Sequence, residues 1–164
     1  MMTCPGSSRR LAVFILVALV AMFSAADDSP AADSTVPSCT PTPADALGPF
    51  YKPGAPLRDS VGKGYVLSGK VMSASGCVPL AGSVIEFWLA GPEGDYLDAY
   101  RATMKAKPDG SYRFECAPPP PYERRPPHIH IRVTAPGHQT LVTQHYPASG
   151  TRSGFMDLVL IPSR

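Results

Sequence analysis

The sequence has few charged residues and no marked excess of either sign. Charged residues make up 17% of its 164 residues, and the formal net charge is +2. Two of the fifteen basic residues, Arg9 and Arg10, precede an uncharged run at 11–26, and removing them leaves thirteen, equal to the thirteen acidic residues. A neutral chain lacks the basic footprint that nucleic acids and anionic membranes select, so we expect neither as a partner.

A membrane-spanning run is also missing, because the apolar run is shorter than a span usually needs. It reads LAVFILVALVAMFSAA, follows two arginines and ends in small residues. This pattern predicts a signal peptide at 1–26 and an exported protein, periplasmic or secreted, with membrane attachment only if the signal stays uncleaved. The arginine pair also partly fits the twin-arginine route, so twin-arginine export and ordinary secretion both stay open.

Long helices are not expected, because 20 prolines and 14 glycines interrupt the chain. Residues 27–45 predict a flexible leader, and residues 46–164 predict one domain that begins with an irregular arm around GPFYKPGAP (48–56). Short apolar or alternating runs then predict strands at 64–73, 82–90, 110–116, 128–135, 139–146 and 154–162. This regular spacing predicts an all-β fold, a two-sheet β-sandwich.

Cysteines are few, and Cys4 would be lost with the signal peptide. Cys39, Cys77 and Cys116 remain, which in an oxidising compartment predicts one disulfide and one free thiol, with the pairing open. Their spacing fits neither a zinc ribbon nor a CxxC redox motif. We therefore expect the disulfide to be structural.

Acidic residues are scarce around the most informative motif, His128-Ile129-His130, where Glu123 is the one carboxylate in the segment. Alternation along a strand points both histidines to one face, with Cα atoms about 6.5–7 Å apart, so both can bind one ion. Tyrosine could supply the missing negative charge, and phenolates with imidazoles suit Fe(III) better than copper(I) or structural zinc. Alternatively, the two histidines are solvated or simply packed.

Six segments in this order are informative together: CTPTPADALGPFY (39–51), GCVPLAGSVIEFW (76–88), the tract 88–96, DGSYRF (109–114), PYERRPPHIH (121–130) and APGHQTLVTQHY (135–146). Together they resemble the intradiol ring-cleavage dioxygenases, the non-haem iron(III) family of protocatechuate and catechol dioxygenases, and especially the short secreted members. The resemblance covers about 39–162. It implies the transthyretin-like (prealbumin-like) β-sandwich of that family, with the arm laid over the site.

The resemblance also implies a mononuclear Fe(3+) site. Tyr96, eight residues beyond Trp88, matches the first tyrosine ligand of the family, and Tyr122 matches the second. The histidines of the RPxHIH motif match His128 and His130. By this resemblance Tyr96 and His128 are equatorial ligands, and Tyr122 and His130 are axial.

The implied reaction cleaves a small aromatic diol with O2 between its two hydroxylated carbons. Tyr122 would accept a substrate proton, Arg125 would stabilise negative charge on the bound ring, and Gln144 would lie beside the site. Two features differ from the usual family pattern: only five residues separate Tyr122 from His128, and the arm reads ALGPFY. The resemblance therefore does not select one catechol.

Two other functions fit the same residues. In a secreted transthyretin-like binding module, the histidines and tyrosines would pack or bind a ligand without catalysis. In a copper or zinc metalloprotein they would belong to a histidine-rich site, for which the four histidines of the chain are a poor supply.

Overall fold

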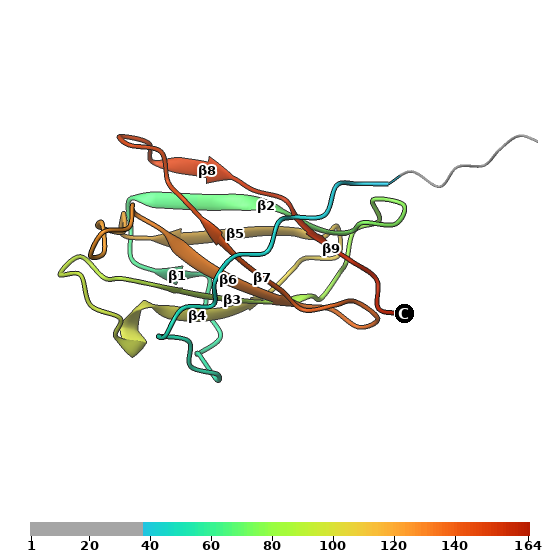
Figure 1. Ribbon diagram of the computed structural model, residues 1–164, viewed down its shortest axis with the longest axis horizontal. Helices are drawn as coiled ribbons and strands as arrows, with labels where there is room; N and C mark the ends of the chain where they lie inside the picture. The colour runs from blue at the N-terminus through green and yellow to red at the C-terminus, as the bar shows by residue number, and fades with distance from the viewer. Residues whose placement is uncertain (1–37) are drawn as a thin grey trace, which may run out of the picture. The chain divides into compact units, whose positions relative to one another are not determined.

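The computed structural model describes residues 38–164, which form two packed β-sheets (Figure 1). One sheet has the order β1-β5-β2-β8, with β9 also paired to β2, and the other has the order β4-β3-β6-β7. The strands are β1 (Ser60–Val61), β2 (Tyr65–Ser73), β3 (Val84–Leu89), β4 (Arg101–Lys105), β5 (Ser111–Cys116), β6 (Ile129–Thr134), β7 (Leu141–His145), β8 (Ser153–Phe155) and β9 (Leu158–Leu160). The predicted all-β sandwich is confirmed.

The helical content of the described part is one short 3-10 turn, Asp98–Tyr100. None of the helical structure in residues 38–164 is long and apolar enough to cross a membrane. The predicted signal peptide at 1–26 and the start of the predicted leader lie outside the described residues.

The hydrophobic core lies between the two sheets and follows the alternation of side chains along the strands. In β6, Ile129, Ile131 and Val133 are fully buried. Across the core, the rings of Phe87 in β3 and Phe114 in β5 stack with centroids 4.1 Å apart. The period of two that predicted these strands is therefore the pattern that fills the core.

Five of the six predicted strands occur with their ends shifted by two residues or fewer, whereas the last prediction, one strand at 154–162, was wrong. The pairing with β2 is interrupted between β8 and β9 because the carbonyl of Met156 lies against Gly69 of β2. Any Cβ atom on residue 69 would collide with this carbonyl oxygen. The carboxylate of Asp157 then accepts the N–H of Lys70 at 2.8 Å, in place of a backbone carbonyl.

Two strands were not predicted at all. The sequence of β4, RATMK, has one β-branched residue and charged ends, yet it pairs along its whole length with β3. β1 is two residues long and pairs in parallel with β5. Both strands form because a neighbouring strand offers hydrogen bonds, which local propensity does not register.

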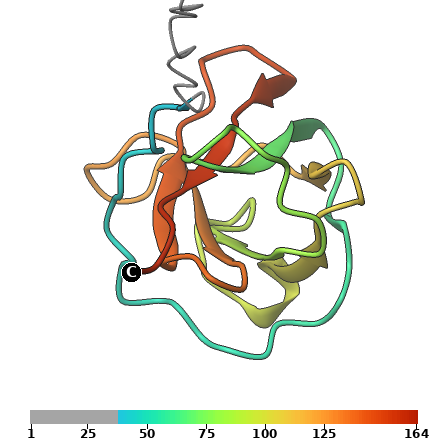
Figure 2. The ribbon, with the colours of Figure 1, turned by 90° about the vertical axis from the view of Figure 1, so that its right-hand side faces the viewer.

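An irregular arm, residues 38–58, crosses the outer face of the β4-β3-β6-β7 sheet, and its path is the blue-to-teal trace in Figure 2. Near its start, the N–H of Asp45 donates to the carbonyl of Val142 in β7 at 2.9 Å. Near its end, the N–H of Arg58 donates to the carbonyl of Thr103 in β4 at 3.0 Å. The arm therefore protects both edges of this sheet as well as its face.

The start of the arm is fixed covalently by a disulfide between Cys39 and Cys77, which resolves the pairing that the sequence left open. Cys116 is free and buried in the core, and burial raises the pKa of its thiol to about 12. A buried, protonated thiol is a packing group rather than a nucleophile.

We expect loss of the disulfide to destabilise the protein substantially. The cross-link closes a loop with a sequence separation of 38 residues, and a loop of this size contributes roughly 3–4 kcal/mol in the chain-entropy model. The double variant Cys39→Ala/Cys77→Ala should therefore unfold about 10 °C below the parent in a thermal scan. The reduced parent is the matched control, because reduction removes the cross-link without changing a side chain, and it should unfold near the temperature of the double variant. A double variant as stable as the oxidised parent would contradict the expectation.

Candidate metal centre and pocket

The floor of the candidate site is a row of side chains on the outer face of three neighbouring strands. Trp88 in β3 lies opposite His130 in β6, which lies opposite Gln144 in β7. Directly paired residues share a face of the sheet, and all three side chains are buried. The indole of Trp88 and the imidazole of His130 stack with centroids 4.9 Å apart and planes 6° from parallel.

Two loops bring tyrosines over this row. Tyr96 lies in the loop after β3, where its carbonyl accepts a hydrogen bond from Nη2 of Arg101 at 3.3 Å. Tyr122 begins a tight turn in which its own N–H and carbonyl pair with the carbonyl and N–H of Arg125 at 3.2 and 2.9 Å. The two phenol rings are 5.2 Å apart and nearly perpendicular. This turn makes it possible for Tyr122 to lie only a few residues before the histidines.

The two histidines lie side by side, as the HxH pattern predicts, with ring centroids 4.9 Å apart. Nδ1 of His128 is 2.8 Å from the carbonyl oxygen of Pro126, so Nδ1 carries the proton and Nε2 keeps its lone pair. That Nε2 is 3.0 Å from the hydroxyl oxygen of Tyr96. Two ligand atoms each about 2.1 Å from one metal ion and at right angles would be about 3 Å apart.

Burial keeps these groups neutral when no cation is bound. Burial raises the pKa of Tyr96 to about 12. Burial, followed by the charges of His128 and Arg125, lowers the pKa of His130 to about 4, and burial also lowers the pKa of His128. At neutral pH the site therefore holds imidazoles with free lone pairs and a phenol that donates to His128.

Gly48 and Phe50 of the arm cover the site. The ring of Phe50 stacks on Tyr96 with centroids 4.3 Å apart and lies perpendicular to Tyr122 at 5.5 Å. Gly48 has φ +74°, and a Cβ there would be 2.9 Å from Cε1 of His130, so both its conformation and its contact favour glycine. A cavity of about 130 Å³ remains, lined by Pro49, Phe50, Tyr96, Tyr122, Glu123, Arg125, His128 and His130.

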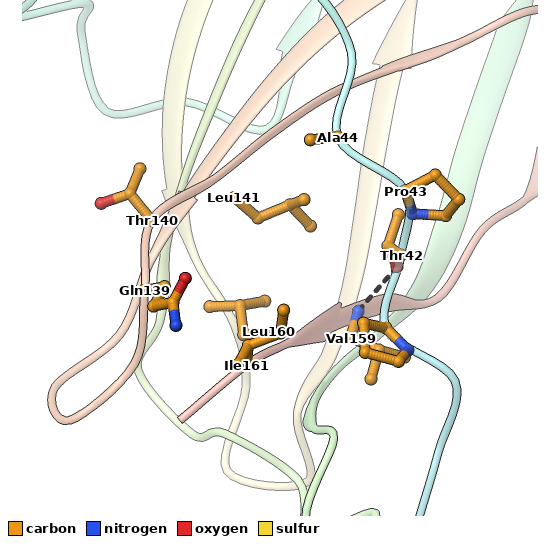
Figure 3. A pocket seen from close by; sticks show the side chains of 10 residues that line it. Thr42, Pro43, Ala44, Gln139, Thr140, Leu141, Val159, Leu160 and Ile161 are labelled. Atoms are coloured by element: carbon orange, nitrogen blue, oxygen red, sulfur yellow. Dashed lines mark hydrogen bonds between the residues drawn. The ribbon is translucent and has the colours of Figure 1, made fainter. Parts of the chain in front are cut away.

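A larger cavity, of about 310 Å³, lies between arm residues 41–44 and the edges of β7 and β9 (Figure 3). On one side of it, Oγ1 of Thr42 accepts the N–H of Val159 at 2.8 Å, the dashed line in Figure 3. Its lining is mostly aliphatic, contains no charged or histidine side chain, and shares no residue with the smaller cavity. The smaller cavity, where titratable groups converge, is therefore the candidate functional site.

The structure brings all six residues that the sequence singled out to this one place. Five line the smaller cavity: Tyr96, Tyr122, Arg125, His128 and His130. The sixth, Gln144, lies behind Arg125, and its Oε1 accepts a hydrogen bond from Nη2 of Arg125 at 2.7 Å.

Several residues at the site were not assigned from the sequence, among them Asp45, Phe50 and Tyr146. The hydroxyl of Tyr146 is 2.9 Å from Nη2 of Arg125 and 2.7 Å from Oδ2 of Asp45. Tyr146 follows Gln144 by two residues in an extended segment, so the alternation that pairs the histidines could have identified it. No local pattern indicates which arm residues reach the site.

The side chains that face each other here fit a hard metal ion bound partly by phenolate. In residues 38–164 there is no group of three or more His, Cys, Asp or Glu side chains suited to a metal. The phenols of Tyr96 and Tyr122 line the same cavity as the two histidines, and phenol oxygens together with imidazoles are a donor combination suited to Fe(III). Nδ1 of His130 is buried without a hydrogen-bond partner among the described residues, a cost that a metal would offset only by binding at Nδ1 itself.

The other two histidines are not part of this cluster. Nε2 of His138 is 3.0 Å from Oγ of Ser73, and Nε2 of His145 is 2.7 Å from the hydroxyl of Tyr65. A copper or zinc site built mainly from histidines, the metalloprotein alternative, therefore gains no third histidine in the described part of the chain.

Comparison with known proteins gives a consistent family match. The family model described as dioxygenase matches residues 52–151. A chlorocatechol 1,2-dioxygenase of Cupriavidus pinatubonensis is 31% identical over 137 residues, which are 63% of this chain and 53% of that protein. A catechol 1,2-dioxygenase of Candida albicans is 33% identical over 140 residues, or 62% of this chain and 46% of that protein. The chain thus spans about half the length of the curated relatives it matches.

Solved structures extend the match to nearly the whole described part. The dioxygenase domain of a dioxygenase carbohydrate-binding protein fusion from Streptomyces sp. SirexAA-E is 30% identical with a TM-score of 0.66, covering 76% of this chain and 100% of that domain. An intradiol ring-cleavage dioxygenase from Tetranychus urticae has a TM-score of 0.69 at 16% identity, covering 77% of this chain and 97% of that chain. The second likeness concerns the fold alone.

We expect the metal-free protein to lose stability in acid partly through His130. Its pKa is about 4 when folded and near 6.5 when unfolded, so between these values the unfolded chain binds a proton that the folded chain rejects. The free energy of unfolding should therefore fall as pH decreases through this window, and His130 should account for about 3 kcal/mol of the fall.

Urea unfolding of the metal-free protein at pH 4 and pH 7 measures this effect, with His130→Gln as the variant that removes the titrating group. The variant should lose less stability between the two pH values. The loss that remains would include His128 and His145, whose pKa values burial also lowers. An unchanged pH dependence in His130→Gln would refute the assignment.

Proposed function

This chain belongs to the intradiol ring-cleavage dioxygenase family, and we propose that it is an intradiol dioxygenase that uses one ferric ion and O2 to open a catechol-type ring between its hydroxylated carbons. The observation that carries the proposal is the convergence of two tyrosines and two histidines on one cavity of about 130 Å³. Relatives named for catechol, chlorocatechol and hydroxyquinol support an aromatic diol as the substrate.

The ferric ion would be held by Tyr96, Tyr122, His128 and His130. Two phenolates lower the net charge of a trivalent ion in a site shielded by the arm, and the neutral imidazoles complete the donor set. When bound, the ion would supply Lewis acidity, withdrawing electron density from a chelated catecholate so that a ring carbon can react with O2.

Tyr122 is proposed to take up a proton from the substrate. Its hydroxyl makes no hydrogen bond within residues 38–164, whereas the hydroxyl of Tyr96 is already engaged with His128. Among the described residues, no hydrogen bond competes for the hydroxyl oxygen of Tyr122. The short turn between Tyr122 and Arg125 keeps this hydroxyl beside the cavity.

Arg125 is proposed to stabilise negative charge that develops on the ring. Its guanidinium lines the cavity, and Gln144 accepts one of its hydrogen bonds from behind. A fixed cation in a partly desolvated cavity stabilises an anionic transition state more than a mobile one does. The aromatic wall formed by Phe50 would shield this charge from water.

We also propose that the protein is exported, through the predicted signal peptide at 1–26. The disulfide between Cys39 and Cys77 supports this proposal, because structural disulfides persist in oxidising compartments and are rare in the cytosol. N-terminal sequencing of protein recovered outside the cytoplasm would test it, with a mature start near residue 27 expected and a start at residue 1 contradicting it.

The metal proposal predicts a visible colour. The iron-loaded protein should show a phenolate-to-iron(III) absorption band that gives it a red to brown colour, with one iron per chain. Tyr96→Phe or Tyr122→Phe should shift or bleach the band, because each removes one phenolate. Absorption spectra and iron analysis of the purified variants measure both effects.

Tyr100→Phe is the matched control, because Tyr100 lies in the same loop region as Tyr96 but does not line the cavity. This variant should keep the iron and the band of the parent. A parent protein that remains colourless and iron-free after incubation with iron would overturn the proposed function. A band that keeps the position and intensity of the parent in both Tyr96→Phe and Tyr122→Phe would overturn the ligand assignment alone.

A further inference from the structure

One nitrogen of Arg125 makes all the hydrogen bonds that fix its guanidinium. Nη2 donates to Oε1 of Gln144 at 2.7 Å and to the hydroxyl oxygen of Tyr146 at 2.9 Å, which uses both of its hydrogens. Within residues 38–164, Nη1 and Nε of Arg125 make no hydrogen bond, although the side chain lines the cavity. The guanidinium is thus held from one edge, and its other donors remain available to a ligand.

Both acceptors of Arg125 continue into the arm. The hydroxyl of Tyr146 donates to Oδ2 of Asp45 at 2.7 Å. Nε2 of Gln144 donates to the carbonyl of Ala46 at 2.6 Å. Two short hydrogen-bonded routes therefore connect Arg125 to two neighbouring arm residues, one route to Asp45 and the other to Ala46.

In the route through Tyr146, the hydroxyl lies between the guanidinium of Arg125 and the carboxylate of Asp45. The hydroxyl accepts from a cation and donates to a carboxylate, so these two hydrogen bonds are charge-assisted. A longer contact joins the same hydroxyl to Oε1 of Gln144 at 3.3 Å. The hydrogen bond from Tyr146, and to a smaller extent the charge of Arg125, lowers the pKa of Asp45. Tyr146 and Asp45 are both exposed, and exposed polar contacts contribute little to stability. Orientation is therefore a better explanation for this geometry than folding energy.

The arm segment that these routes hold is the one that walls the cavity. Gly48 contacts His130, and Phe50 stacks on Tyr96, three and five residues beyond Asp45. The same pair of arm residues therefore supports the guanidinium and positions the aromatic wall. Release of one would disturb the other.

We propose that Asp45 and Tyr146 are positioning residues, which latch the arm over the cavity and aim the free edge of Arg125 at the substrate. The catalytic part of this proposal rests on the proposed dioxygenase function. The latch itself is a property of the protein with or without a metal. Its two parts can therefore be tested separately.

Turnover of catechol by the iron-loaded protein tests the positioning role. Tyr146→Phe and Asp45→Ala should each lower kcat about tenfold, because the guanidinium is then held firmly by Gln144 alone and turns toward water more readily, while KM changes less than threefold. Asp45→Asn keeps an acceptor oxygen and should be nearer to the parent. The double variant Tyr146→Phe/Asp45→Ala should be no worse than either single variant, since both break one route.

Thr143→Val is the matched control. Oγ1 of Thr143 donates to the carbonyl of Pro43 at 2.9 Å, so this change removes a hydrogen bond from β7 to the arm without touching Arg125. A purely structural role for Tyr146 would give both variants the same kcat. The positioning role requires a lower kcat in Tyr146→Phe alone.

A measurement on the metal-free protein separates the latch from the chemistry. The Nη2–H signals of Arg125 in ¹⁵N NMR should be resolved and slowly exchanging in the parent and in Thr143→Val, because Nη2 makes both hydrogen bonds, and averaged in Tyr146→Phe and Asp45→Ala. If the parent fails to turn over catechol but this pattern holds, the dioxygenase proposal fails and the latch stands. If the Arg125 signal is the same in all variants, or kcat is unaffected in Tyr146→Phe, the latch is overturned.

Discussion

Strand β6 is buried on both faces, and the rest of the structure depends on how those two faces are covered. Its inner face, with Ile129 and Ile131, fills the core, while the outer face presents His130 beside Trp88. An outer face with a buried, neutral imidazole needs a cover, which the arm provides by crossing the whole sheet. The arm therefore completes the fold and at the same time forms one wall of the cavity.

Most of the polar groups at the site are neutral while no cation is bound. Burial raises the pKa of Tyr96 to about 12 and lowers the pKa of His130 to about 4, so the metal-free site carries little charge. Binding of the proposed ferric ion would therefore displace a phenol proton. Arg125 is the exception, since its charge is permanent. It is connected to the arm through hydrogen bonds of Gln144 and Tyr146.

Much of the fold and of the site could be predicted from alternation along strands. Period-two patterns located five strands closely and placed His128 and His130 together. The same patterns failed where tertiary contacts decide: β4 forms because β3 pairs with it, and residues 154–162 split because a carbonyl lies over Gly69. The contributions of Asp45 and Phe50 could not be predicted, because the path of an irregular arm is fixed by its contacts with β7, β4 and the disulfide.

The proposed reaction opens a catechol ring between its two hydroxylated carbons and puts both atoms of O2 into the product. Mass spectrometry of the product formed from catechol by the iron-loaded protein under ¹⁸O2 tests this reaction. We expect an unbranched dicarboxylic acid that carries two ¹⁸O atoms, and no such product from Tyr122→Phe. An aldehyde-containing product from cleavage beside the diol, or a diacid labelled with a single ¹⁸O atom in the absence of exchange with water, would contradict it.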